Sequence, residues 1–173
     1  MLFRSLNEAT SDIFSTMVEF YAANANDPGD YLIGEKISVS GGALRSMIQP
    51  SADGASADCW YSGVGSLDVH YSSGVANHFF FMLAEGTNSS LGASPTCKAG
   101  DTRVATGTGS LTGIGRDAAA KIWYRALTTK MTSSTDYAGA RAATITAAKE
   151  LAATLGADYS AQVAAAWTAV GRN

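Results

Sequence analysis

Apolar side chains along this chain recur at the spacing of a helix, and no run alternates convincingly in the way a strand does. The pattern predicts helices over residues 5–23, 113–131, 136–155 and 160–170, the last two rich in alanine. A further helix, capped by Ser72 or Ser73, is expected to end at Gly86. The fold class is therefore mainly α, with about five helices and long structured loops over residues 30–68 and 88–112. In the first loop, Pro50 would close one short helix.

Size and charge narrow the class of protein further. A length of 173 residues, 46% of them hydrophobic, fits one domain spanning 1–173 with its own core. The net charge is −3 without any block of like charges, which disfavours nucleic acid and anionic membranes as partners. The longest wholly apolar run, Phe79 to Ala84, is far shorter than the ~20 residues that span a bilayer. No membrane segment is expected.

The two cysteines give information on whether the protein is secreted. Cys59 and Cys97 lie in stretches rich in Gly, Ser and Asp, where they either form a disulfide with each other or stay free as redox-active thiols. The low content of charged residues and such a pairing hint at a secreted protein. The first eight residues lack the apolar stretch of ~7–15 residues of a secretory signal, so an export signal would lie elsewhere.

Three carboxylates form a stripe on the first predicted helix. At 100° per residue, Glu8, Asp12 and Glu19 fall within ~40° of one another. This stripe is either the solvated side of an amphipathic helix or a face that meets a metal or a cationic side chain, because like charges one turn apart repel. The pattern alone leaves both interpretations open.

Other candidate residues also have a plain structural alternative. His70 follows Asp68 by two residues, so the carboxylate either orients the imidazole or is a chance neighbour in a loop. Arg45 could clamp a carbonyl through its planar guanidinium, or lie on the surface. His78, inside the most apolar segment, is expected to be a packed histidine rather than a ligand. The chain contains no Gly-x-x-x-x-Gly-Lys, Gly-x-Ser-x-Gly or His-Glu-x-x-His motif.

Four motifs follow one another along the chain. They are Asn7-Glu8-Ala9-Thr10-Ser11-Asp12-Ile13-Phe14, Leu44-Arg45-Ser46-Met47, Asp68-Val69-His70-Tyr71-Ser72-Ser73-Gly74-Val75, and Gly113-Ile114-Gly115-Arg116-Asp117 with Ile122-Trp123-Tyr124-Arg125-Ala126-Leu127. In order and spacing they resemble the thermolysin-like neutral metalloproteases. The likeness runs from about Asn7 to Gly171 and implies that family's C-terminal, mostly helical domain. The form Asp68-x-His70 is more similar to the vibriolysin and pseudolysin branch.

The resemblance implies a role for each matching residue. Glu8 would be the third zinc ligand, and Asp12 the carboxylate that fixes a zinc-bound histidine. His70 would donate a hydrogen bond to the oxyanion, with Asp68 orienting it, and Arg45 would bind a substrate carbonyl. A second set would bind the substrate side chain or calcium: Leu44 and Ile33 would line a pocket for a bulky apolar residue after the cleaved bond, while Glu19, Asp30 and the Leu32 carbonyl would form a calcium site.

Two functions are therefore expected to compete. The first is the C-terminal domain of a secreted zinc metalloendopeptidase that acts on peptide or protein substrates. Because the zinc histidines and the general base are missing from this chain, we expect them in an N-terminal catalytic domain, and we expect the chain alone to be inactive. The alternative is a non-catalytic helical binding module or truncated paralogue.

Overall fold

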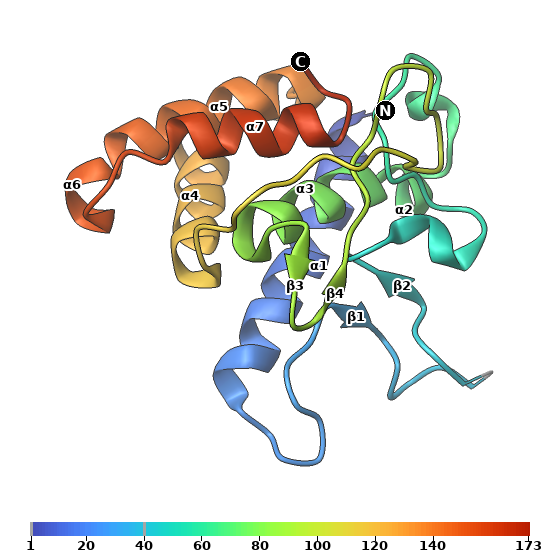
Figure 1. Cartoon of the computed structure of the whole chain (residues 1–173). Helices are drawn as coiled ribbons and strands as arrows, with labels where there is room; N and C mark the ends of the chain where they lie inside the picture. Colours follow the sequence, from blue (N-terminus) through green and yellow to red (C-terminus); the bar gives the residue numbers. More distant parts are fainter. Residues whose placement is uncertain (1, 40) are drawn as a thin grey trace.

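Helix α1 (Leu2–Ala22) follows the first apolar pattern and buries Leu6, Ala9 and Ile13 in the core. The computed structural model describes residues 2–39 and 41–173. Half-buried positions on another side of α1 carry Glu8 and Glu19. The helix begins three residues earlier than the pattern predicted, and is otherwise as expected. It passes behind the centre of the molecule in Figure 1 and supplies one wall of the site described below.

The loops, where the structure describes them, contain four short strands that the sequence pattern did not reveal. Strands β1 (Leu32–Ile33) and β2 (Arg45–Ser46) pair antiparallel, as do β3 (Asn88–Ser89) and β4 (Gly92–Ala93). Each strand has only two residues, which is too short for any alternation to be visible in the sequence. The short helix expected before Pro50 is also wrong, because residues 45–46 are extended and a 3₁₀ turn over Pro50–Asp53 follows instead. A second 3₁₀ turn spans Val64–Ser66.

The segment after the first loop becomes helical earlier than predicted. Asp68 caps helix α2 (Val69–Ser72) by accepting a hydrogen bond from the backbone N–H of His70. Ser73, one of the two expected serines, stands at the N-cap of α3, but its hydroxyl makes no capping hydrogen bond and donates to the His70 carbonyl instead. Helix α3 (Gly74–Glu85) follows directly and is buried from Gly74 to Ala84. A helix apolar on all sides belongs in the middle of a fold, and Figure 1 shows α3 at the centre.

The C-terminal helices cover one side of α3. They are α4 (Arg116–Thr129), α5 (Tyr137–Glu150), the short α6 (Ala152–Leu155) and α7 (Ser160–Ala169). Helices α5 and α7 lie side by side (Figure 1). The predicted helix over 136–155 is interrupted at Leu151, which separates α5 from α6. The Trp167 ring stacks on that of Phe79, with centroids 3.9 Å apart, and so joins α7 to the core.

A disulfide closes the side of the molecule near the C-terminus. Cys59 and Cys97 are joined with their Cα atoms 5.8 Å apart, which is the pairing that the sequence analysis placed first. The backbone N–H groups of Cys97 and Trp60 donate to the carbonyls of Ala169 and Val170, so both arms of the bridge hold the end of α7. None of the helices in the described ranges is long and apolar enough to cross a membrane.

Candidate active site

His70 is held by the residue that starts its own helix. The Asp68 carboxylate Oδ1 accepts from the His70 backbone N–H at 2.9 Å and lies 2.7 Å from the ring Nδ1. The backbone hydrogen bond, followed by the ring contact, lowers the pKa of Asp68. Both side chains are more than half exposed, so the imidazole is oriented and yet open to a ligand. The interpretation of His70 and Asp68 as chance neighbours in a loop is therefore wrong.

The free ring nitrogen of His70 points to helix α1. Its Nε2 lies 3.6 Å from Glu8 Oε2, and the Glu8 side chain is one third exposed. One turn further along α1, Asp12 is only 3% exposed. Neither position of the acidic stripe is fully solvated: Glu8 is partly buried beside the α2 histidine, and Asp12 is buried.

Arg45 in β2 donates two parallel hydrogen bonds to the Asp12 carboxylate. Its Nε lies 2.9 Å from Asp12 Oδ2 and its Nη2 lies 2.7 Å from Oδ1, a bidentate pair between a strand and a helix. This hydrogen bonding raises the pKa of Arg45 further. A cationic side chain therefore lies opposite the carboxylate stripe, and the plain surface interpretation of Arg45 is wrong.

Asn77 of α3 belongs to the same cluster and was missed in the sequence. Its Nδ2 donates to Asp12 Oδ2 at 2.8 Å, and the residue is 1% exposed. The sequence did contain a signal, since Asn77 is a polar residue inside an apolar helix. His78 beside it shows the same signal, so polarity alone did not single out Asn77. The structure makes His78 the packed histidine expected of it: Nδ1 meets the Asp58 carbonyl at 2.9 Å and Nε2 the Ser94 hydroxyl at 2.7 Å.

Leu44 and Ile33 lie beside the guanidinium-bearing strand. Ile33 is the register partner of Arg45 in the β1–β2 pair, and the Leu44 backbone N–H donates to the Ile33 carbonyl at 2.8 Å. Leu44 is 48% exposed and Ile33 is half-buried. The strand pairing therefore brings Ile33 next to Leu44 and Arg45, which lie about a dozen positions further along the chain.

The residues expected to bind calcium are neighbours in the structure. Glu19 accepts from the Asp30 backbone N–H, and the Asp30 carboxylate accepts from that of Leu32. The carboxylates that approach Glu19 within 4.8 Å are those of Asp27 and Glu35, which the sequence analysis did not single out. Burial raises the pKa of Glu19, and the acidic neighbours raise it further.

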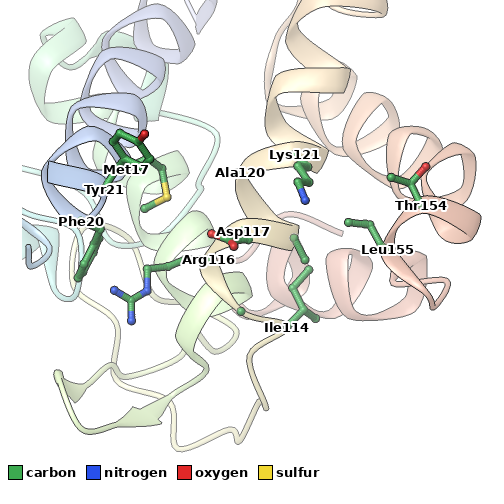
Figure 2. Close-up of a pocket in the computed structure, with 12 residues that line it drawn as sticks. Met17, Phe20, Tyr21, Ile114, Arg116, Asp117, Ala120, Lys121, Thr154 and Leu155 are labelled. Carbon is green, nitrogen blue, oxygen red and sulfur yellow. The ribbon is translucent and has the colours of Figure 1, made fainter. Parts of the chain in front are cut away.

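A groove of the described surface lies away from these residues. It has a volume of about 780 Å³ and is bounded by the end of α1, the start of α4 and the tip of α6 (Figure 2). Arg116 closes it on one side by stacking on Phe20 and pairing with Glu85. None of the residues predicted for catalysis or metal binding lines this groove. The chemistry of the chain is concentrated at the α1–β2–α2 junction instead.

A family model describes almost the whole of this arrangement. Residues 5–171 match the α-helical domain of the thermolysin metallopeptidases. The chain belongs to this family. The resemblance inferred from the four motifs is thus confirmed, and with it the mainly α fold of the thermolysin C-terminal domain.

Relatives of known activity agree with that assignment. The chain is 53% identical over 172 residues to a transglutaminase-activating metalloprotease of Streptomyces mobaraensis, covering 95% of the chain and 21% of the relative. It is 38% identical over 153 residues to bacillolysin of Bacillus caldolyticus and 37% identical over 153 residues to thermolysin of Alicyclobacillus acidocaldarius; each match covers 85% of the chain and 24% of the relative. The thermolysin-family domain described here therefore spans about a quarter of the length of these metalloproteases.

Proposed function

We propose that this chain is the part of a zinc metalloendopeptidase that supplies the third metal ligand and the groups that bind the transition state. One observation carries the proposal: Glu8, Asp12, Arg45, Asp68 and His70, which are spread over three separate segments, converge on one junction in the structure. A structural ion pair would need only two of them. The set matches the requirements of metal-assisted hydrolysis, which are a ligand, a group that orients ligands and donors for an oxyanion.

The residues present fit a zinc ion that is completed from outside this chain. Among the described residues the Glu8 carboxylate forms one ion-pair contact, at 3.6 Å with His70, which leaves lone pairs free to coordinate. Asp12 Oδ1 accepts one hydrogen bond and keeps a lone pair for the N–H of a zinc-bound imidazole. No group of three metal-binding side chains in the described ranges includes Glu8. The remaining ligands would be the histidines expected upstream.

Each side chain then has a distinct task. Bound zinc would polarise the scissile carbonyl and activate a water molecule. Asp68 holds His70 Nδ1, so that the ring would present Nε2 to the oxyanion that develops. Asp12 takes two of the five N–H donors of Arg45 and leaves three for a carbonyl of the substrate.

The substrate preference follows from the same junction. We propose that Leu44 and Ile33 contact the side chain after the cleaved bond and favour bulky apolar residues there. In a peptidase that includes this chain, Leu44→Ala should raise KM for peptides with Leu at that position and change KM little for peptides with Gly. Val104→Ala is the matched control, because Val104 is as exposed as Leu44 at 46% and is absent from the site. Equal effects of both variants would contradict the pocket.

Zinc binding is the direct test of the proposed function. A protein that carries an upstream His-Glu-x-x-His segment together with this chain should bind one zinc ion per molecule, and Glu8→Gln should release it. Glu150→Gln, which removes an exposed carboxylate paired with Arg125 and Lys130, should leave the zinc content unchanged. Retention of zinc by Glu8→Gln, measured by elemental analysis, would assign Glu8 another role.

The 173-residue chain alone should not hydrolyse peptides, because it offers one of the three protein ligands that zinc catalysis needs. Casein digestion by the purified chain, sensitive to a chelator and lost in Glu8→Ala, would contradict this. The alternative function, a non-catalytic helical module, predicts that the upstream segment adds neither zinc nor activity.

Calcium and secretion complete the proposal. We propose that Glu19 contributes to a calcium site near Asp30 and the Leu32 carbonyl, with Asp27 and Glu35 as nearby acidic groups. Titration calorimetry with Ca²⁺ should show binding that Glu19→Gln abolishes and Glu150→Gln preserves.

The disulfide supports an oxidising, extracellular location. The Asp68-x-His70 form supports the vibriolysin and pseudolysin branch.

A further inference from the structure

The side chain of Asn77 is buried with one of its polar atoms unpaired, which costs free energy. The side chain is 1% exposed in the middle of α3, and its Oδ1 has no hydrogen-bond partner among the described residues. A buried amide oxygen without a donor loses its hydration with nothing in return. An apolar residue of the same size would carry no such cost.

The orientation of the amide explains why the oxygen is left alone. An ionised carboxylate can only accept, so the amide must turn its NH₂ group to Asp12, and Nδ2 lies 2.8 Å from Asp12 Oδ2. That turn directs Oδ1 away from the carboxylate, where no donor meets it. The unpaired oxygen is therefore the consequence of serving Asp12.

Asp12 has two partners that together fix the plane of its carboxylate. Arg45 bonds to both oxygens from β2, and Asn77 bonds to Oδ2 from α3. Without Asn77, the carboxylate and the guanidinium could rotate together as a pair, because Arg45 is anchored on a two-residue strand. The third hydrogen bond comes from a helix that is buried from Gly74 to Ala84, so it ties Asp12 to the centre of the fold.

We propose that Asn77 is a positioning residue that fixes the orientation of the Asp12 carboxylate and, through it, the Arg45 guanidinium. Its importance for catalysis rests on the proposed function, whereas its effect on Arg45 does not. Helix α3 also continues from α2, which carries His70. Asn77 therefore sets the carboxylate on α1 relative to the histidine segment.

The test on the 173-residue chain follows the Nε–H proton of Arg45 by ¹⁵N NMR. Asn77→Leu, matched in size, should let this proton exchange with water about tenfold faster, since one charge-assisted hydrogen bond of the cluster is lost. Thr144→Val removes an equally buried hydrogen bond, to the Trp167 indole at 2.9 Å, and should leave the Arg45 signal unchanged. Asn77→Ala serves the same purpose if leucine does not fit.

The outcomes separate the two proposals. Unchanged Arg45 exchange in both Asn77 variants would overturn the positioning role. In a zinc-loaded protein that includes the upstream segment, Asn77→Leu should lower kcat while Tm stays the same or rises, whereas a structural residue would lose both. If exchange accelerates but the unmodified protein cleaves no peptide, the proposed function fails and the effect of Asn77 on Arg45 stands.

Discussion

At the scale of single residues, the site is organised around a carboxylate that solvent does not reach. Asp12 was predicted to share a face with Glu8 because helical periodicity fixes angles reliably. Its partners come from segments whose approach depends on tertiary structure, so Arg45 could be assigned from the sequence only through the family resemblance. Asn77 was not predicted, because nothing in its neighbourhood distinguishes a buried amide that serves a carboxylate from one that merely packs.

Removal of Arg45 should expose how much the cluster depends on charge pairing. Arg45→Met leaves Asp12 buried without a counter-ion, and such a change costs about 3–5 kcal/mol. Arg125→Met, which breaks a pair with the exposed Glu150, should cost much less, because exposed ion pairs are screened by solvent. Urea unfolding of both variants measures the difference. Equal costs would mean that Asp12 is hydrated.

His70 should matter for the reaction rather than for the metal. In a peptidase that includes this chain, His70→Ala should lower kcat. The activation free energy should rise by about 2.7–4 kcal/mol, the loss typical of one oxyanion donor. KM should change far less and the zinc content should stay the same. A variant that loses zinc while it keeps its fold would make His70 a ligand.

At the scale of elements, long periodic helices were predictable and short elements were not. The bounds of α4, α5 and α7 follow the apolar pattern within a few residues, apart from the break at Leu151. The strands have two residues each, and Asp27 and Glu35 reach Glu19 through loop geometry that no periodicity encodes. The early start of α2 had a visible signal, since Asp68 is a good N-cap.

Helix α3 should make stability depend on pH. Burial lowers the pKa of His78 below its ordinary value of 6.5, more than the hydrogen bond to the Asp58 carbonyl and the Asp58 charge raise it. The unfolded chain therefore takes up the proton first as the pH falls. The stability that neutral His78 contributes is present above about pH 6.5 and is lost as the pH falls towards the lower folded pKa.

His78→Asn tests this dependence, since the amide can still donate to the Asp58 carbonyl. The free energy of unfolding of the unmodified chain, measured by denaturant titration from pH 8 to pH 5, should decrease more than that of the variant. Parallel curves would show that other groups are responsible.

At the scale of the whole molecule, the disulfide joins two loops that are hydrogen-bonded to the end of α7. Cys59→Ser with Cys97→Ser should lower stability by up to about 4 kcal/mol, the chain-entropy value for a separation of 38 residues. Differential scanning calorimetry of the double variant measures the loss. An unchanged Tm would mean that the hydrogen bonds to Ala169 and Val170 hold the loops without the bridge.

The position of α7 has a consequence for synthesis on the ribosome. Trp167 stacks on Phe79 at the centre of the core, and residues 169–170 receive the hydrogen bonds from Trp60 and Cys97. Helices that emerge first therefore lack the surface that completes their packing until almost the entire domain has left the exit tunnel. At about 5–20 residues per second, the roughly ninety residues between the two rings take several seconds to translate. During that interval the apolar surface of α3 that Trp167 covers in the folded domain is exposed.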